Sequence, residues 1–507
     1  MKHPIVGDYL SALQKEKLLI SHSLSKETLC KEAKCLTYDT RELSSDAIFI
    51  CKGAHFKETY LDFAVSGGAI CYVSEKDYGR PEGILVSDIR KAMPILARLF
   101  FDNAPEKLVS IGITGTKGKS TVTYYLRAIL DRYMKAMNKP RIAVISSIDT
   151  YDGVNDFESH ITTPEAVEFY RHFDNAYKSG ITHLVSEISS QALKYDRVAG
   201  VCFDIALFTN IGTDHISPIE HSDFEDYFSS KLKIFNSCKN AVINSDSDYS
   251  DRIIDSARGK CNIITYGTSP DDTIYCSSIE KRGNGFYFNV KTPKFEKEMC
   301  ITMPGIFNVS NALAAIAVCH ILGIDEKYIS EGLSNARVSG RMQVYTSKDK
   351  NIAIIVDYAH NKMSFNALYN TVGIEYPGYS VVSVFGCPGC KAHLRRKDLA
   401  EEADAHSDYI VITEEDSGEE PFSDIASDIA SNIKECPYSM IEDRGQAIKD
   451  AVFGFKAEKK VILFTGKGEE TRLKRGLVYE DCPTDAQLSI DILKEYDELA
   501  EKATKIH

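Results

Sequence analysis

Residues 108–130 read LVSIGITGTKGKSTVTYYLRAIL and combine an apolar run, a glycine turn and a helical pattern. This order predicts a buried strand, a tight loop and an amphipathic helix, the context of a phosphate-binding loop. The glycines allow backbone N–H groups to close around phosphate oxygens, and the helix N-terminus adds partial positive charge. We therefore predict nucleotide binding by the loop residues Gly115, Thr116, Lys117, Gly118, Lys119, Ser120 and Thr121.

The side chains of this loop suit a nucleotide triphosphate and its metal ion. Lys119 is placed to reach the terminal phosphates, and the Ser120 and Thr121 hydroxyls can orient Mg²⁺. The loop is shorter than the commonest pattern of this kind. The alternative interpretation is an ordinary strand, turn and helix that carries surface lysines.

The composition is that of a globular protein with several domains. The 507 residues can bury an ample core and suggest about three domains. The net charge of −13 argues against a nucleic-acid-binding surface. We expect no secretory leader and no membrane insertion, because no apolar run is long enough for either. The 14 cysteines form no disulfide framework, so we expect reduced thiols and a cytoplasmic location.

Apolar runs divide the chain into three α/β segments. Residues 1–106 carry short strands and turns, and residues 107–336 alternate strands with helices, as in a parallel sheet covered on both faces. Residues 337–507 form a third α/β unit. Residues 281–290 predict an antiparallel hairpin at the edge of the central sheet. The strands predicted for the second and third segments are 108–113, 141–146, 182–187, 203–208, 240–244, 262–266, 352–356, 379–385, 409–413 and 460–464.

Polar residues follow two of the predicted central strands. Glu187 ends one strand, and a carboxylate there faces the same crevice as the phosphate loop, so it is a candidate Mg²⁺ ligand. His215 follows another strand and can bind a metal or orient a phosphate, although a structural histidine is the alternative. Lys231 lies in a helical pattern and by itself predicts only a surface lysine.

Four motifs, taken in order, resemble the Mur ligase family. They are GTKGKST at 115–121, EISS at 187–190, FTNIGTDH at 208–215, and a helix with Tyr227 followed by Lys231. Mur ligases are ATP-dependent amide-forming enzymes that build the peptide of bacterial cell-wall precursors. The resemblance covers nearly the whole chain. It implies an N-terminal UDP-binding domain, a central ATPase domain and a C-terminal Rossmann-like domain that binds the amino acid.

The resemblance also implies residues of the ATP site. Asn308 and Asn311 match asparagines that lie near the adenine. Arg341, in Gly-Arg-Met, would contact the terminal phosphate, and Asp357 would contact the ribose. ATP is therefore the implied nucleotide.

Two Mg²⁺ ions are implied as well, and Lys231 contributes to one of them. In the family the matching lysine is carbamylated by CO₂, which turns a cation into a carboxylate. The implied metal ligands are Ser120, Glu187, His215 and Lys231 as the carbamate. The implied catalytic residues are Lys119, Lys231, His215 and Arg341.

The N-terminal segment resembles one branch of the family, the UDP-N-acetylmuramoyl-tripeptide synthetases, which add the third amino acid. The motif Tyr-Asp-Thr-Arg at 38–41 carries this likeness. The implied substrates are UDP-N-acetylmuramoyl-L-alanyl-D-glutamate and a free amino acid, bound by a monomeric enzyme of peptidoglycan synthesis. The residues implied to bind the UDP substrate are Thr40, Thr162, Thr163, Ser189 and Arg197.

The third segment departs from the pattern of diaminopimelate-adding members. Their Asp-Asn-Pro-Arg motif is replaced by an acidic stretch at 413–421, and Lys391 stands where they have a second arginine. Such a pocket suits an ammonium-tipped side chain, which favours L-lysine or another basic amino acid. The residues expected to bind the amino acid are Lys391, Glu415, Asp416, Gly466 and Glu470.

Several alternatives remain at this point. The acids at 413–421 can instead simply solvate a loop, which would leave meso-diaminopimelate as the added amino acid. A histidine of the family is replaced by Gln191 and another by Glu469, and both changes bear on which amino acid is added. A paralogue acting on another carboxylate and a non-catalytic nucleotide-binding scaffold are the remaining interpretations.

Overall fold

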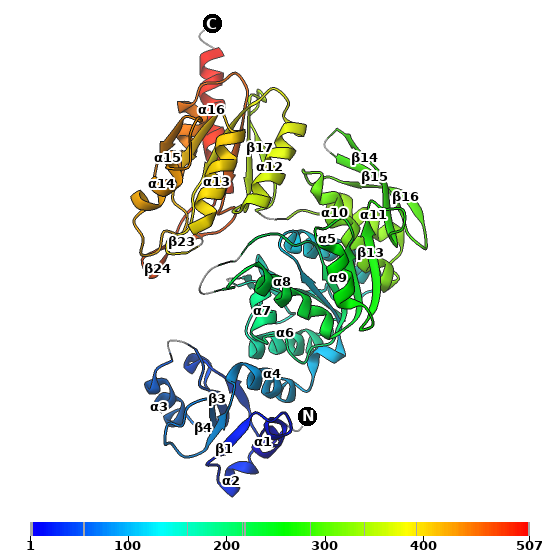
Figure 1. Ribbon diagram of the computed structural model, residues 1–507, viewed down its shortest axis with the longest axis vertical. Coiled ribbons are helices and arrows are strands. Elements are labelled where there is room, and N and C mark those ends of the chain that lie inside the picture. Colours follow the sequence, from blue (N-terminus) through cyan, green and yellow to red (C-terminus); the bar gives the residue numbers. More distant parts are fainter. Residues whose placement is uncertain are drawn as a thin grey trace.

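The computed structural model describes residues 4–53, 56–159, 161–214, 216, 220–283, 285–338, 340–391 and 393–504. Three bodies follow one another along the long axis, with the N-terminal body at one end and the C-terminal body at the other (Figure 1). Each body is built on its own sheet, of 5, 11 and 6 strands respectively. The three sheets fall within the segments 1–106, 107–336 and 337–507, which we keep as the proposed domain limits.

The N-terminal sheet has the strand order β1-β5-β4-β3-β2, and only β1 is antiparallel to its neighbour. Its strands are β1 (Leu19–His22), β2 (Cys35–Thr37), β3 (Ala47–Ile50), β4 (Ala69–Ser74) and β5 (Gly83–Val86). Its helices are α1 (Val6–Lys15), α2 (Lys26–Leu29), η1 (Thr40–Glu42), α3 (Glu58–Ser66), α4 (Ile89–Phe100) and η2 (Ala104–Lys107).

The core of the N-terminal domain continues into the central domain without a break. Helix α4 presents Met93 and Leu96 to the same apolar cluster that contains Phe169 and Tyr170 of the central helix α6 (Ala166–Lys178). Because apolar burial is the main favourable term in domain packing, these two domains are held in a fixed relation.

The central sheet has the order β16-β15-β14-β13-β12-β11-β6-β10-β7-β8-β9, and its middle strands are parallel. Its strands are β6 (Val109–Thr114), β7 (Ala143–Ile145), β8 (Asp149–Tyr151), β9 (Asp156–Glu158), β10 (His183–Glu187), β11 (Phe203–Phe208), β12 (Cys238–Asn244), β13 (Asn262–Gly267), β14 (Ile274–Arg282), β15 (Gly285–Lys291) and β16 (Glu296–Ile301). The remaining helices are α5 (Lys119–Ala136), α7 (Ser190–Lys194), α8 (Phe224–Leu232), η3 (Lys233–Asn236), α9 (Ser250–Ala257), α10 (Phe307–Leu322) and α11 (Glu326–Asn335).

Alternating side chains give this sheet two apolar faces. Ile205 and Leu207 point into one cluster with α5 and α10, whereas Ala206 and Phe208 point into the other with α6 and α8. Burial on both faces explains why the predicted central strands read as continuous apolar runs, and all six are present.

The predicted hairpin at 281–290 is present as β14 and β15, but its position at the edge of the sheet is wrong. Strand β16 pairs with β15 and forms the outer edge. At the opposite edge the short strands β8 and β9 were not predicted. Their alternation of polar residues gives no apolar run to recognise.

The C-terminal sheet has the order β17-β18-β22-β19-β20-β21, and only β17 is antiparallel. Its strands are β17 (Gln343–Thr346), β18 (Ile352–Asp357), β19 (Ser380–Phe385), β20 (Tyr409–Ile412), β21 (Tyr438–Met440) and β22 (Lys460–Thr465), and a separate hairpin is formed by β23 (Arg472–Arg475) and β24 (Val478–Asp481). Its helices are α12 (Lys362–Glu375), α13 (His393–His406), α14 (Phe422–Ala430), α15 (Arg444–Lys449), the π-helix η4 (Asp450–Gly454) and α16 (Asp485–Thr504).

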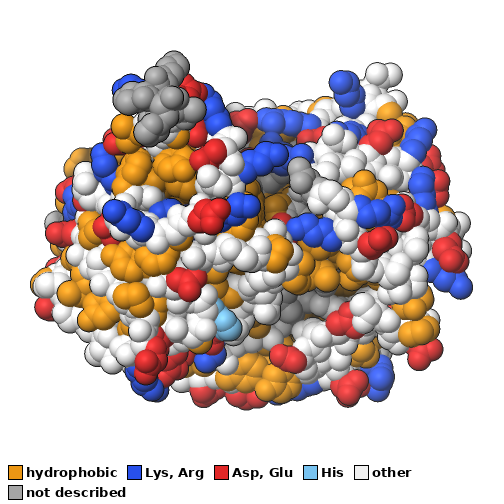
Figure 2. Space-filling model, turned by 90° about the horizontal axis from the view of Figure 1, so that it is seen from above, with side chains coloured by type: hydrophobic (Ala, Val, Ile, Leu, Met, Phe, Trp, Pro, Cys, Tyr) orange, Lys and Arg blue, Asp and Glu red, His pale blue; other side chains and the backbone are white. Residues whose placement is uncertain are grey.

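The C-terminal domain has apolar clusters of its own on the two faces of its sheet. Seen from the C-terminal end, side chains of both charge signs are mixed over the surface with apolar ones between them (Figure 2). None of the helices in the described ranges is both long and apolar enough to cross a bilayer.

Candidate active site

A cavity of about 1360 Å³ lies between the central and C-terminal domains. The phosphate loop, the ends of β7 and β10 and the start of α10 line it from the central side. The ends of β18 and β22 and the loops after β19 and β20 line it from the C-terminal side. Carboxyl ends of parallel strands therefore face each other across the cavity, the usual place for a ligand in open α/β sheets.

The glycine loop has the strained conformation that only glycine adopts readily. Gly118 has a φ of 86°. An added Cβ there would lie 2.3 Å from Oδ1 of Asn311. The neighbouring strand holds the loop in place, because Lys117 N donates to Oδ1 of Asn210 at 2.8 Å and Thr209 Oγ1 donates to Lys117 O at 2.6 Å.

Two lysines converge on the carbonyl of Gly115. Lys119 Nζ donates to it at 3.0 Å and Lys231 Nζ at 2.9 Å. Burial lowers the pKa of both ammonium groups, and the neighbouring charge of Lys119 lowers the pKa of Lys231 further. Lys231 is only 2% exposed, so the surface lysine predicted from the helical pattern alone is wrong.

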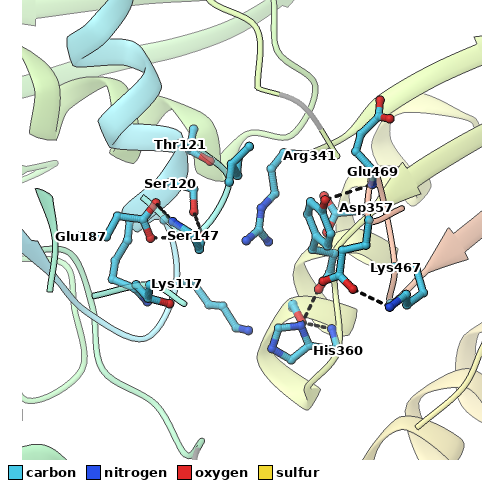
Figure 3. Close-up of a pocket in the computed structure, with 18 of the residues that line it drawn as sticks. Lys117, Ser120, Thr121, Ser147, Glu187, Arg341, Asp357, His360, Lys467 and Glu469 are labelled. Atoms are coloured by element: carbon cyan, nitrogen blue, oxygen red, sulfur yellow. Dashed lines mark hydrogen bonds and ion pairs between the residues drawn. The ribbon is translucent and has the colours of Figure 1, made fainter. Parts of the chain in front are cut away.

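Glu187 and Ser120 meet beside the loop through Ser147 (Figure 3). Ser147 Oγ lies 3.1 Å from Ser120 Oγ and donates to Glu187 Oε2 at 3.4 Å. Burial raises the pKa of the Glu187 carboxyl, and the nearby Lys119 opposes this. His215 lies outside the described residues. Among those described, no three His, Cys, Asp or Glu side chains form a metal-binding group.

Several side-chain oxygens that line the cavity suit a magnesium–nucleotide complex. Ser120, Ser147 and Glu187 supply two hydroxyls and a carboxylate beside backbone N–H groups of the loop. Oxygen donors of this kind, completed by phosphate oxygens and water, are what Mg²⁺ prefers. The residues present fit the group.

The predicted nucleotide contacts from the rest of the chain lie around the same loop. Asn311 Nδ2 donates to Asn308 Oδ1 at 3.0 Å, and both asparagines line the cavity beside Gly118. Arg341 projects into the open space opposite Ser120 and Ser147, and Asp357 lies on the far side of Arg341 from them (Figure 3). Asp357 accepts from Met342 N at 2.8 Å, and burial raises the pKa of its carboxyl.

Asp214 links the two sides of the cavity, a role that was not predicted. Its carboxylate accepts from Asn361 Nδ2 at 2.6 Å and lies 3.7 Å from Lys117 Nζ and 3.9 Å from Arg395 Nη2. The charge of Lys117, together with burial, lowers the pKa of His360 far below its usual value.

Residues predicted to bind the UDP substrate gather on the central domain, with one exception. Thr163 Oγ1 accepts from Ser189 N at 2.9 Å, and Arg197 Nη1 donates to Thr163 O at 3.1 Å. Thr162 lines the cavity. Thr40 lies in η1 of the N-terminal domain and is not among the residues that line the cavity.

The acidic loop is largely neutralised by basic residues from elsewhere. Arg475 pairs with Glu414 at 2.7 Å. Lys467 pairs with Asp416 at 2.9 Å and with Glu470 at 2.5 Å. Arg396 pairs with Glu420 at 2.7 Å. The expectation of a generally acidic pocket is therefore too simple.

Glu415 has a buried carboxylate oxygen that no described donor satisfies. Its Oε2 is buried and has no hydrogen-bond partner among the described atoms, and it lies 3.0 Å from where a Cβ on Gly466 would be. Burial raises the pKa of Glu415 to about 7. Lys391 and Arg395 also line the cavity, and the charge of Arg395 opposes the rise in the pKa of Glu415.

Some cavity residues were missed at the sequence level. Ser147, His360, Arg395 and Lys467 are the clearest cases. Ser147, His360 and Lys467 lie within a few residues of the ends of predicted strands, so the carboxyl-end rule could have flagged these three. Their partners lie far away in the sequence, and no local pattern gives those.

Two long segments of the chain match domain models of one known protein family. Residues 113–319 match the Mur ligase middle domain and residues 340–468 match the Mur ligase glutamate ligase domain. The chain belongs to the Mur ligase family, and its class is that of ATP-dependent, amide-bond-forming ligases. Within the family its similarity is to the tripeptide synthetases. The resemblance and the α/β fold class predicted from the sequence are confirmed.

Two relatives illustrate this. The chain is 36% identical to the UDP-N-acetylmuramoyl-L-alanyl-D-glutamate–L-lysine ligase of Enterococcus faecalis, over 90% of this chain and 91% of the relative. It is 33% identical to the UDP-N-acetylmuramyl-tripeptide synthetase of Lactobacillus acidophilus, over 95% and 96%.

Solved structures with lower identity share the fold. A UDP-N-acetylmuramoyl-L-alanyl-D-glutamate–2,6-diaminopimelate ligase matches with a TM-score of 0.63 at 23% identity, over 95% of this chain and 98% of that one. MurF from Acinetobacter baumannii matches with a TM-score of 0.67 at 18% identity, over 97% and 99%.

Proposed function

We propose that this ligase joins L-lysine to UDP-N-acetylmuramoyl-L-alanyl-D-glutamate, with ATP as the energy source, in peptidoglycan precursor synthesis. The observation that carries the choice of lysine is the free, buried carboxylate oxygen of Glu415 beside Gly466. The name of the Enterococcus relative supports the same substrate pair.

The reaction requires activation of a carboxylate, since a free carboxylate resists attack by an amine. Transfer of the terminal phosphoryl group of ATP gives an acyl phosphate and ADP. The amine of the amino acid then attacks the acyl carbon, the amide bond forms, and inorganic phosphate leaves. Lys119 from the loop and Arg341 from the C-terminal domain both line the cavity and would hold the transferred group.

Mg²⁺ would neutralise phosphate charge during that transfer. Ser120 and Glu187 would hold one ion, and His215 and carbamylated Lys231 would hold a second. The depressed pKa of Lys231 supports carbamylation, because the neutral amine is the form that reacts with CO₂. Its buried position would keep water away from a carbamate on this side chain.

The UDP substrate would extend from the N-terminal domain to the cavity. Thr40 lies at the N-terminal end of this path, and Thr162, Thr163, Ser189 and Arg197 lie at the central end. A single chain supplies the whole path, so we propose that the enzyme acts as a monomer.

Glu415 would receive the side-chain ammonium of lysine. An ammonium group can satisfy the free Oε2 atom and replaces an unpaired buried acid with a charge-assisted hydrogen bond. A carboxylate-tipped side chain would instead place two acids together in a buried site, which is costly.

The test is phosphate release with the UDP dipeptide substrate and ATP, comparing lysine, ornithine and diaminopimelate. We expect lysine to be preferred, Glu415→Gln to weaken that preference, and Lys119→Ala to abolish release. Lys135→Ala, an exposed lysine on the same helix α5, is the matched control. A clear preference for diaminopimelate would contradict the role of Glu415, and turnover by Lys119→Ala would contradict the loop assignment.

A further inference from the structure

A buried ion pair lies directly behind the amino-acid end of the cavity. Arg444, at the start of α15, donates from Nε and Nη2 to the two carboxylate oxygens of Asp485, at 2.8 and 2.6 Å. The Asp485 side chain is 1% exposed and that of Arg444 is 9% exposed. Neither residue lines the cavity.

The remaining donors of Arg444 bind two backbone carbonyls. Nη1 donates to Glu414 O at 2.8 Å, and Nη2 donates to Thr465 O at 3.0 Å. Glu414 directly precedes Glu415, and Thr465 directly precedes Gly466. The planar guanidinium thus spans the bases of both loops that carry the proposed amino-acid contacts.

Asp485 continues the same network into the second loop. Its Oδ2 accepts from Gly468 N at 3.0 Å, while its own N donates to Gly468 O at 3.0 Å. The ring of Phe464 lies under the guanidinium, 4.6 Å from its carbon. Packing and hydrogen bonds therefore leave the Arg444 side chain one orientation.

We propose that the Arg444–Asp485 pair is a positioning device for the incoming amino acid. It fixes the separation between the Glu415 loop and the loop from Gly466 to Glu470, so that the carboxylate and the backbone groups engage one ligand together. This inference rests on the proposed function for the location of the amino-acid site. Arg444 and Asp485 would act only through these loops, without touching any substrate.

The geometry gives a reason for arginine at this position. Two carbonyls and a carboxylate surround one group, and only a flat, forked cation can donate to all of them in a plane. Lysine keeps the charge but is a point donor and cannot hold both loops. Arg444→Lys therefore separates the forked geometry from the charge.

The test measures the KM of every substrate for Arg444→Lys and for Asp485→Asn. We expect the KM for the amino acid to rise at least about ten-fold, because misplacement of supporting groups by about 1 Å has effects of this size. The KM values for ATP and the UDP substrate should stay within about two-fold. A parallel rise of all three would overturn the proposal.

The control is Lys460→Met in the same domain. Lys460 is also a buried cation that bonds backbone carbonyls, donating to Val452 O at 2.6 Å and Ala451 O at 3.2 Å, but these lie away from the cavity. This variant should lower thermal stability and leave the KM for the amino acid unchanged. If it raises that KM as much as Arg444→Lys does, the effect is one of stability alone and the proposal is wrong.

Hydrogen exchange supplies a readout that needs no turnover. Amides of residues 414–418 and 466–470 should exchange faster in Arg444→Lys than in Lys460→Met. Equal exchange in the two variants would contradict the proposal. If the wild-type enzyme uses an amino acid other than lysine, the proposed function fails, while the KM comparison with that amino acid still tests the ion pair.

Discussion

At the scale of single residues, the burial of Glu415 bears directly on the proposed binding of lysine. The carboxyl group has a raised pKa of about 7 because burial penalises its charged form. The lysine ammonium stays protonated well above this range. On the proposed role of Glu415, we therefore expect the affinity for lysine to follow the ionised fraction of this one acid.

The KM for lysine should fall as pH rises toward about 7 and level off above it. The limiting slope is about ten-fold per pH unit, since the ionised form of one group is required. Initial rates at varied lysine concentration, from about pH 5.5 to about pH 8.5, measure this. Glu415→Gln should have a higher KM and lose the dependence, and a wild-type KM that ignores pH would contradict the assignment.

The same residue predicts a stability effect of the opposite sign. The folded protein without ligand holds this proton up to about pH 7, whereas the unfolded chain releases it near the ordinary carboxyl value. Stability contributed by the neutral form is therefore present at low pH and lost as pH rises through about 7. Urea unfolding should find Glu415→Gln more stable than the wild type at about pH 8 by roughly 1–3 kcal/mol, and less so at about pH 5.

At the scale of elements, the junction of β6 and α5 depends on glycine for two separate reasons. Gly118 lies in the left-handed region, and a Cβ there would also collide with Asn311. Gly180, between α6 and β10, has a φ of 74° but nothing within 4 Å of an added Cβ. The two positions share the backbone strain and differ in the collision.

Gly118→Ala should abolish measurable nucleotide binding and destabilise the fold by roughly 1–3 kcal/mol. Gly180→Ala should cost about 1 kcal/mol and leave nucleotide binding intact. Calorimetric titration with a nucleotide and urea unfolding separate the two effects. Equal nucleotide affinity in both variants would show that the collision with Asn311 does not matter.

The predictable parts of the fold are those that follow from short, contiguous stretches of sequence. Buried strands such as β6 and β11 are apolar runs, and the phosphate loop is a contiguous motif whose conformation follows from its glycines. The resemblance to a family added the order of the domains. Polar strands such as β9, β23 and β24 carry no such signal, because half or more of their residues face water.

The sequence predicted many of the residues that form the candidate site, but it did not predict which of them pair with each other. The acids at 413–421 were visible, but Arg475 and Lys467, which neutralise Glu414 and Asp416, lie 61 and 51 residues away. Only tertiary structure decides which acid keeps a free oxygen. The same holds for Asp214, whose partner Asn361 lies 147 residues along the chain.

At the scale of the whole molecule, the two domain boundaries differ in kind. The boundary between the N-terminal and central domains is an apolar core, whereas polar groups such as Asp214 and Asn361 meet across the cavity. Polar interfaces of this sort are easier to separate than apolar ones. We therefore expect the C-terminal domain to be the part that moves when substrates enter and products leave.

Asn361→Ser should weaken the contact between the central and C-terminal domains while keeping the start of α12. Asn361 caps α12 and a serine can do the same, but its shorter side chain cannot reach Asp214. We expect kcat/KM to fall about ten-fold and the radius of gyration in solution scattering to rise, with little change in stability. An unchanged scattering profile together with unchanged kinetics would contradict the role of this contact.

The shared core beneath α4 also has a calorimetric consequence. Because one apolar cluster serves the first two domains, neither can melt without exposing the interior of the other, so they should unfold in a single endotherm. The third domain, with separate clusters, should give its own peak. Because we propose that nucleotide binds in the cavity between these units, adding it should raise both melting temperatures and draw the peaks together. In a calorimetric scan without nucleotide, the three domains should therefore unfold as two cooperative units.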